Sequence, residues 1–291
     1  MEKIRVSYYD KRVNNFIIPA TAQAYNDKID RADERVTELA RIIAVANQKG
    51  GVGKTTTAVN LAACLAAKRQ RVLLVDCDPQ GNASSGFGID KSALTMTVYQ
   101  VLLGTAKIRE AIRKTAFKAD ILPANIELAG AEIELVSAMS REARMKKALA
   151  EVKDEYDYIL IDCPPSLGLL TLNSLAAAGT VLMPIQCEFY ALEGVSQLMN
   201  TIDLVRSNLN ADLAVEGVLM TMYDTRTRLA EQVVAEVKEA FGELVYKVRI
   251  PRTVRLSEAP SYGQPILYYD KGSKGAEVYQ RLAKEVMAHG K

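Results

Sequence analysis

The chain has 291 residues, 49% of them hydrophobic, which is enough for a full core in one large domain or two small ones. Its 37 basic and 35 acidic residues give a net charge of only +2, so any affinity for nucleic acid must come from a local patch. With a single histidine, His289, and four cysteines that form no C-x-x-C pair, we expect no zinc centre, disulfide framework or histidine-based catalysis.

The hydropathy pattern gives no sign of a membrane protein. No stretch approaches the roughly 18 uninterrupted apolar residues that span a bilayer. The start of the chain, with Glu2, Lys3, Arg5 and Asp10, lacks a secretory core. The widely spread cysteines suit a reducing compartment. We therefore expect a soluble, cytoplasmic protein that does not bind membranes.

The first 40 residues differ from the rest of the chain. They are polar and sparsely patterned, with a helix expected from about Asp27 to Ala40. We predict an N-terminal extension over residues 1–40, followed by one large α/β domain over residues 41–291. Three interpretations of the extension stay open: an arm for a partner or neighbouring subunit, a docked terminus and a partly disordered one.

From Arg41 onward, short apolar runs alternate with longer amphipathic segments, as in repeated β–α units. This order predicts a three-layer α/β sandwich with a mainly parallel central sheet. Helices are expected over Thr57–Ala67, packed on the sheet, and over Ala143–Val152, with basic residues in solvent. The expected strands are Ile42–Ala46, Val72–Asp76, Tyr158–Asp162, Val181–Ile185, Val215–Met222 and Val245–Ile250.

The first expected strand leads into a glycine-rich run from Gln48 to Thr56, and then into the first helix. A strand, a glycine turn, a lysine and two threonines at a helix start build a phosphate-binding loop. The glycines let backbone N–H groups face a polyphosphate, and the helix N-terminus adds positive potential. Lys54 can reach the β and γ phosphates, and Thr55 is the expected Mg²⁺ ligand. The predicted nucleotide ligands are Lys49, Gly50, Gly51, Val52, Gly53, Lys54, Thr55 and Thr56.

A second lysine, Lys49, makes this loop unusual, and Gln48 replaces the first glycine of the general G-x-x-x-x-G-K-[ST] pattern. The run K-G-G-x-G-K-T-T resembles the deviant Walker A motif of the ParA/MinD family of P-loop ATPases. The resemblance implies ATP and Mg²⁺ as cofactors and a homodimer in which Lys49 reaches the partner subunit's nucleotide. Because positive charge is useful beside phosphates, we favour this role over that of a solvated loop lysine.

Two carboxylates, Asp76 and Asp78, follow the buried run that begins at Val72. At a strand end they would point toward the phosphate loop. One acid can hold Mg²⁺ through water while the other orients the attacking water. The segment D-C-D-P-Q-G-N resembles the switch I segment of ParA proteins, in which the second acid has the hydrolytic role. The resemblance implies that Asp78 is catalytic, together with Lys49 and Lys54, and that Asp76 supports the metal.

A third carboxylate, Asp162, ends the run that begins at Tyr158 and precedes a cysteine and two prolines. Largely apolar residues that deliver one acid to a strand end look like a Walker B motif. We expect Asp162 in the Mg²⁺ shell, and we expect the prolines to stiffen a switch II loop that senses the γ phosphate. Cys77 and Cys163 lie beside these acids, but we expect them to be small buried residues and not ligands.

Two later stretches extend the resemblance to ParA/Soj chromosome-partition ATPases from about Arg41 to the end of the chain. They are Met222–Arg226 and Ile250–Pro260. The resemblance implies that Met222 and Pro251 enclose the adenine.

The same region is basic. Between Tyr246 and Leu256 the chain carries no acidic residue, which suits contacts with phosphates. We call the following residues the basic strip: Lys247, Arg249, Arg252 and Arg255, with Arg226 and Arg228 from the neighbouring stretch. ParA/Soj relatives bind nonspecific DNA with arginines at these places. This implies DNA contacts by Arg226, Arg252 and Arg255 when two subunits align their patches, whereas a solvated basic loop is the plainer interpretation.

These patterns predict a ParA-like partition ATPase. In this hypothesis ATP and Mg²⁺ join two subunits, and the dimer binds the DNA of the nucleoid without sequence preference. Slow hydrolysis, stimulated by a ParB-like centromere-binding partner, then releases it. The motifs are the same for a chromosome, a plasmid or another large cargo.

Other members of the wider family remain as alternatives. A MinD-like membrane ATPase needs a C-terminal amphipathic helix, whereas Val278, Leu282, Val286 and Met287 form a modest stripe of the kind that packs on a sheet. A metal-cluster carrier needs cysteines that bridge a dimer. A non-enzymatic nucleotide-binding module conflicts with the presence together of Lys49, Lys54, Asp78 and Asp162.

Overall fold

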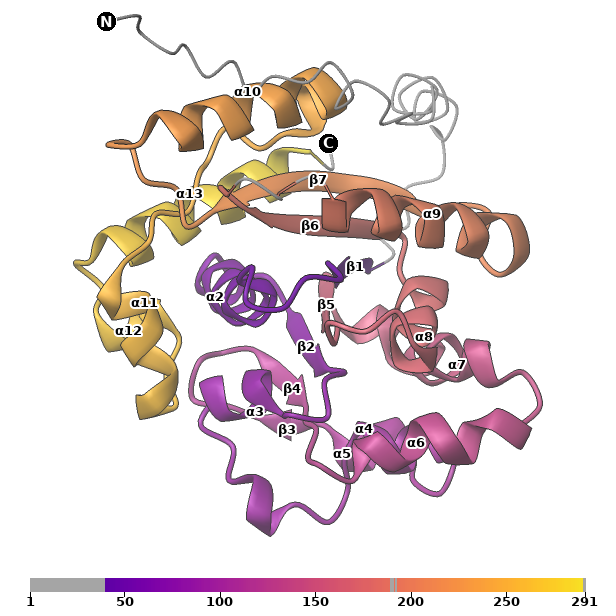
Figure 1. The fold of residues 1–291 in the computed structure, drawn as a ribbon. Helices are drawn as coiled ribbons and strands as arrows, with labels where there is room; N and C mark the ends of the chain where they lie inside the picture. The colour runs from indigo at the N-terminus through magenta and orange to yellow at the C-terminus, as the bar shows by residue number, and fades with distance from the viewer. Residues whose placement is uncertain (1–39, 189–190, 192, 290–291) are drawn as a thin grey trace, which may run out of the picture. The chain divides into compact units, whose positions relative to one another are not determined.

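A computed structural model describes residues 40–188, 191 and 193–289. The expected helix from Asp27 to Ala40 and the predicted extension lie outside the described residues, apart from Ala40. A seven-stranded sheet forms the centre, in the order β3-β4-β2-β5-β1-β6-β7, with only the β3–β4 pair antiparallel (Figure 1). The strands are β1 Arg41–Val45, β2 Val72–Asp76, β3 Arg113–Lys114, β4 Asp120–Leu122, β5 Tyr158–Asp162, β6 Thr180–Gln186 and β7 Ala214–Thr221.

Helices cover both faces of this sheet, so the expected α/β fold is confirmed. The α-helices are α2 Lys54–Ala67, α3 Asn82–Gly86, α4 Val98–Leu103, α5 Ile108–Ala111, α6 Leu128–Glu134, α7 Arg144–Ala150, α8 Leu169–Ala177, α9 Glu193–Asn208, α10 Arg228–Phe241, α11 Val254–Glu258, α12 Ile266–Tyr269 and α13 Lys274–Ala288. Helices α2 and α13 pack together on one face, while α7 and α8 pack together on the other (Figure 1). Strands β2 and β5 are buried along their whole length, which explains their continuous apolar sequences.

Most of the strand predictions are confirmed. Strands β2 and β5 have the predicted bounds, and the bounds of β1 and β6 differ from the prediction by one residue at each end. Strands β3 and β4 at one end of the sheet were not predicted, because they have only two and three residues. The helix expected over Ala143–Val152 is shorter, with α7 ending at Ala150 and a 3-10 turn before it.

The strand predicted over Val245–Ile250 is wrong. This segment lies beside β7, where the amides of Tyr246 and Ile250 donate to carbonyls of β7, but only isolated bridges form. The amides between them, of Lys247 and Val248, donate instead to the Glu285 carboxylate of α13, at 2.7 and 3.1 Å. A side chain from a helix therefore takes the donors that a continued ladder would use.

The parallel register places three strand ends side by side. Asp162, the last residue of β5, is level with Val45 of β1 and Asp76 of β2. The loops that follow these three strands must therefore meet at one edge of the sheet, where open α/β folds bind ligands.

Gly217 allows the segment after α10 to pack against β7. A Cβ at this position would lie 2.6 Å from the ring of Tyr246 and 3.0 Å from the Leu244 carbonyl oxygen. We expect Gly217→Ala to lower the free energy of unfolding by about 1–3 kcal/mol through overpacking, measured by urea denaturation. Gly179→Ala is the matched control, because its Cβ would meet nothing closer than 3.8 Å. Equal stability of the two variants would contradict this account.

Candidate functional site

The loop between β1 and α2 has the backbone of a phosphate-binding turn. Gly51 and Gly53 adopt left-handed conformations, with φ of 75° and 91°, which residues with a Cβ rarely adopt. Gly53 is the N-cap of α2 and supplies no side chain, so the first amides of the helix keep their donors free of a capping side chain. These donors and the helix dipole favour an anion at this point.

Lys54 lies at the start of α2 and is buried. Its Nζ donates to the carbonyl oxygen of Lys49 at 3.0 Å, so the side chain folds back over the loop. Burial lowers the pKa of the ammonium group, and the negative charges of Asp162 and Asp78 oppose this effect. The lysine is thus held inside the loop, near two of the predicted acids.

Asp76 and Asp162 are both fully buried at the ends of adjacent strands, yet their surroundings differ. The Oδ2 of Asp76 accepts from the backbone N–H and the hydroxyl of Ser84, both at 2.7 Å, and its Oδ1 accepts from the Asp78 amide at 3.3 Å. Asp76 therefore has a structural task, which is to hold the start of α3 against β2.

Asp162 has no such partners. Neither of its carboxylate oxygens makes a hydrogen bond of normal geometry with any described residue. Burial, and then the charge of Asp76, raise the pKa of Asp162, while the Thr55 hydroxyl and the Lys54 ammonium lower it. Buried polar atoms without partners are costly, so this carboxylate is arranged for a ligand that is not a protein side chain.

Asp78 completes the acidic group. It is buried, and its Oδ1 accepts from the Gln80 amide at 2.9 Å, whereas its Oδ2 makes no hydrogen bond with a described residue. Two of these carboxylates, Asp78 and Asp162, lie near the one buried lysine, and Asp76 lies beside Asp162 on the next strand, so negative charge is in excess next to the loop. The described residues do not form a ready-made cluster of three or more metal ligands. The donor set fits Mg²⁺, which takes one or two protein oxygens and fills its shell with phosphate and water.

Lys49 forms an ion pair with Glu188, just beyond the end of β6, and both side chains are about one-third exposed. Its backbone amide donates to the side chain of Asn47 at 3.0 Å, and Asn47 in turn donates to the Pro184 carbonyl at 2.7 Å. The loop is therefore fastened to β6. Sequence reasoning missed Asn47 and Glu188, because only the strand order shows that β6 lies next to β1.

The end of β7 also reaches the loop. The Thr221 hydroxyl donates to the Val52 carbonyl at 2.7 Å, and Met222 leaves the strand with a left-handed φ of 51°. Tyr223 then pairs with Pro251 in an isolated parallel bridge. The structure therefore brings the two stretches that contain Met222 and Pro251 together next to the phosphate loop, while their contact with adenine stays a prediction.

Cys77 and Cys163 lie directly behind the acidic group and are fully buried. Burial raises the pKa of the Cys77 thiol to about 12, and the pKa of the Cys163 thiol shifts in the same direction for the same reason. Such thiols are protonated at neutral pH and act as small apolar residues.

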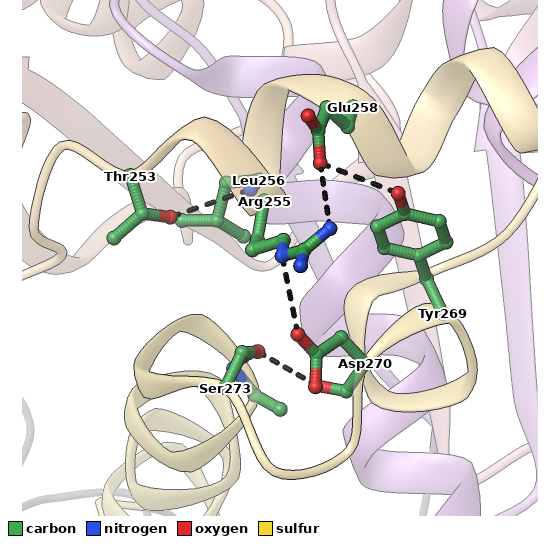
Figure 2. A network of polar contacts seen from close by, with 8 residues as sticks. Thr253, Arg255, Leu256, Glu258, Tyr269, Asp270 and Ser273 are labelled. Carbon is green, nitrogen blue, oxygen red and sulfur yellow. Dashed lines mark hydrogen bonds and ion pairs between the residues drawn. The ribbon is translucent and has the colours of Figure 1, made fainter.

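The basic strip is present, but most of its arginines have carboxylate partners. Arg226 pairs with Asp224 at 2.7 Å, and Arg249 pairs with Glu231 at 3.3 Å. Arg255 contacts both Glu258 and Asp270, as Figure 2 shows. Arg252 is exposed and has no such partner among the residues that the structure describes. The bridge between Tyr223 and Pro251 confirms that the two basic stretches adjoin.

Comparisons with known proteins agree with this geometry. A family model described as an AAA domain matches residues 40–215. Over 253 residues the chain is 60% identical to the sporulation initiation inhibitor protein Soj of Bacillus subtilis, covering 87% of this chain and 100% of that protein. It is 55% identical over 258 residues to the chromosome partitioning protein ParA of Myxococcus xanthus, covering 88% and 91%.

A solved structure extends the comparison to bound nucleotide. Cobyrinic acid a,c-diamide synthase from Mycobacterium smegmatis, with bound ADP and magnesium, superposes with a TM-score of 0.77 at 42% identity, covering 87% of this chain and 96% of that one. One conclusion follows from the fold, from the loop between β1 and α2, and from the sequence identity to Soj and ParA over most of the chain. The chain belongs to the ParA/Soj family of P-loop partition ATPases.

Proposed function

We propose that this protein is an ATP-dependent dimerising switch that binds DNA without sequence preference and releases it after slow hydrolysis. The observation that carries this proposal is the buried Asp162 carboxylate, which lacks hydrogen-bond partners among the described residues next to the buried Lys54. A buried acid without partners beside a loop of free amides is costly unless a ligand fills the site. ATP with Mg²⁺ supplies both the anion for the loop and the cation for the acid.

Each residue then has a task that its position allows. The amides of Gly51 and Gly53 and the ammonium of Lys54 bind phosphate oxygens. Thr55 and Asp162 hold Mg²⁺, directly or through water, and Asp76 supports them from the next strand. When bound, Mg²⁺ neutralises phosphate charge. The free Oδ2 of Asp78 orients the water that attacks the γ phosphate, a step that depends mainly on positioning.

Lys49 links nucleotide binding to dimerisation in this proposal. Its ion pair with Glu188 is partly exposed, and such pairs contribute on the order of 0–1 kcal/mol. The phosphates of a nucleotide on a facing subunit carry more negative charge than one carboxylate, so they compete well for Lys49. The dimer would form only when both nucleotides are present and would come apart after the γ phosphate leaves.

We assign nonspecific DNA as the ligand of the dimer, contacted by Arg226, Arg252 and Arg255. Two copies of the basic strip on one dimer would bind one duplex more tightly than either copy alone. A ParB-like partner would stimulate hydrolysis, in a cytoplasmic, nucleoid-associated cycle. The higher identity to Soj and ParA than to the M. smegmatis synthase favours a partition role over amide synthesis.

A MinD-like membrane ATPase, or a positioning ATPase for another cargo, is the alternative. Within the described residues no helix is long and apolar enough to cross a membrane. The apolar stripe of α13 is also used internally: Val278, Leu282 and Val286 are buried, and the hydroxyl of Tyr279 meets that of Thr57 on α2 at 3.3 Å. This helix therefore offers no apolar face to a bilayer, which favours DNA over a membrane as the ligand.

Replacement by asparagine should have opposite effects on the free energy of unfolding at Asp162 and at Asp76. Asp162→Asn removes a buried charge whose oxygens accept no hydrogen bond of normal geometry from the described residues, and it should raise the free energy of unfolding of the nucleotide-free protein by about 1–2 kcal/mol. Because the folded state raises the pKa of Asp162, the contribution of this one residue to wild-type stability falls as pH rises above about 4. The stabilisation by Asp162→Asn should therefore be small at about pH 4 and grow as the pH rises to neutrality.

Asp76→Asn is the matched comparison at the same depth. It places an amide against the Ser84 donors and should cost about 1–3 kcal/mol. Urea denaturation with and without ATP and Mg²⁺ measures both effects, and Asp162→Asn should also lose the stabilisation that the ligands give. A less stable Asp162→Asn protein would show that this acid is satisfied without a ligand.

The switch itself predicts that only ATP gives DNA binding. With ADP the protein should be monomeric and bind a duplex weakly, whereas with ATP and Mg²⁺ it should dimerise and bind. Asp78→Ala should preserve the ATP dimer and prolong its life on DNA, because hydrolysis is lost while the loop is intact. Light scattering gives the oligomeric state, and fluorescence anisotropy gives DNA binding. An ATP dimer without DNA affinity at low salt would refute the DNA assignment and leave the ATPase assignment standing.

Arg255→Ala should weaken the binding of all DNA sequences by a similar factor, since phosphate contacts carry no sequence information. The slope of log affinity against log salt should fall by about one for each phosphate that the variant no longer neutralises. Titrations of two unrelated duplexes at several salt concentrations measure both quantities. Lys274→Ala, an exposed lysine on α13 outside the strip, is the control for loss of one positive charge. Unchanged affinity and slope in Arg255→Ala would remove this residue from the interface.

A further inference from the structure

Three arginines of the basic strip are neutralised by carboxylates of the same chain. Arg226 pairs with Asp224, Arg249 with Glu231, and Arg255 with both Glu258 and Asp270. The side chains of Arg226 and Arg255 are largely exposed, so their ion pairs lie at the surface and not in the core. A surface that binds phosphates would bind them better without these acids. Their presence therefore calls for a physical reason.

The arrangement around Arg255 is the most elaborate of the three (Figure 2). The Nη1 of Arg255 lies 3.1 Å from Glu258 Oε2, one turn along α11, and its Nε lies 3.4 Å from Asp270 Oδ2, just after α12. The Tyr269 hydroxyl donates to the same Glu258 oxygen at 3.3 Å and so holds that carboxylate in place. Two acids from two elements thus contact two of the three nitrogens of one guanidinium.

We propose that Glu258 and Asp270 are internal competitors for the DNA phosphates at Arg255, and that they lower the affinity of a single subunit for DNA. A carboxylate oxygen binds a guanidinium nitrogen much as a phosphate oxygen does, so the two kinds of ligand compete for Nη1 and Nε of Arg255. This inference rests on the proposed DNA-binding function and adds to it the residues that set the affinity of the surface.

The strength of these ion pairs suits such a competition. Exposed ion pairs are weak because water screens the charges, so a DNA phosphate can displace the carboxylates from Arg255. The same acids repel the DNA backbone once they are displaced. Each subunit therefore binds DNA less tightly than its arginines alone would allow. Two aligned strips on a dimer bind one duplex together, and their high effective concentration lets the dimer stay bound where a single weakened strip does not.

The test uses the full chain with a non-hydrolysable ATP analogue and Mg²⁺, and a fluorescent nonspecific duplex in anisotropy titrations. Glu258→Gln and Asp270→Asn should each tighten binding by about two- to fivefold, which is the range that exposed ion pairs give. The ADP form of the double variant should begin to bind DNA. Tyr269→Phe, which changes no charge, should tighten binding by a smaller factor.

Glu277→Gln is the matched control. Glu277 pairs with Lys274 at the same i,i+3 spacing on the exposed side of α13, so the substitution changes net charge equally without removing a carboxylate partner of Arg255. Each carboxylate substitution is also made in the Arg255→Ala background, as a double-mutant cycle. If the acids act through Arg255, their effect should vanish there.

The outcomes separate the inference from the function on which it rests. A gain at Glu258→Gln no larger than at Glu277→Gln, or one that persists without Arg255, would overturn the competition and leave DNA binding intact. If the unsubstituted ATP-state protein bound no duplex and Arg255→Ala changed nothing, both the DNA assignment and this inference would fall.

Discussion

The rest of the structure depends on two buried carboxylates, Asp76 and Asp162, which end β2 and β5 beside the loop that follows β1. Parallel strands in equal register bring Asp76 and Asp162 together, and burial makes the ionised form of each costly. The chain satisfies one acid with Ser84 and leaves the other to Lys54 and a ligand. Such a site costs stability in the free protein, and a functional ligand can offset that cost.

The phosphate loop also touches the strands on its other side. Thr221 at the end of β7 donates to the Val52 carbonyl, and Tyr223, two residues later, pairs with Pro251, which lies between Arg249 and Arg252 of the basic strip. The ring of Tyr223 lies 4.7 Å from the guanidinium of Arg249. The chain of contacts from loop to strip is therefore short, and it consists of a hydroxyl bond to the loop, a backbone bond from Tyr223 to Ile250 and a ring contact with Arg249. A change in the loop has a direct structural route to the surface that we assign to DNA.

The parts of this site that sequence could predict are those in which one local pattern dictates one geometry. Gly51 and Gly53 are needed for left-handed backbone, and the continuous apolar runs of β2 and β5 fix their bounds and the acids that end them. The predicted ladder at Val245–Ile250 failed for a non-local reason, because Glu285, on α13, takes two of its amides. The roles of Glu188 and Asn47 could not be predicted from the sequence for the same kind of reason, since they follow from β6 lying beside β1.

Burial separates the two kinds of charge pairing in this protein. At the nucleotide site the acids are fully buried, so their charges act over short distances in a low dielectric and demand a specific ligand. On the basic strip the pairs are exposed, so water and salt weaken them and other anions exchange with the carboxylates. A tight, specific site for a small ligand and a loose, exchangeable surface for a long polyanion require these opposite environments. The proposed switch would use both environments, because nucleotide binding at the buried site would set the state of the subunit and the exposed surface would bind and release DNA according to that state.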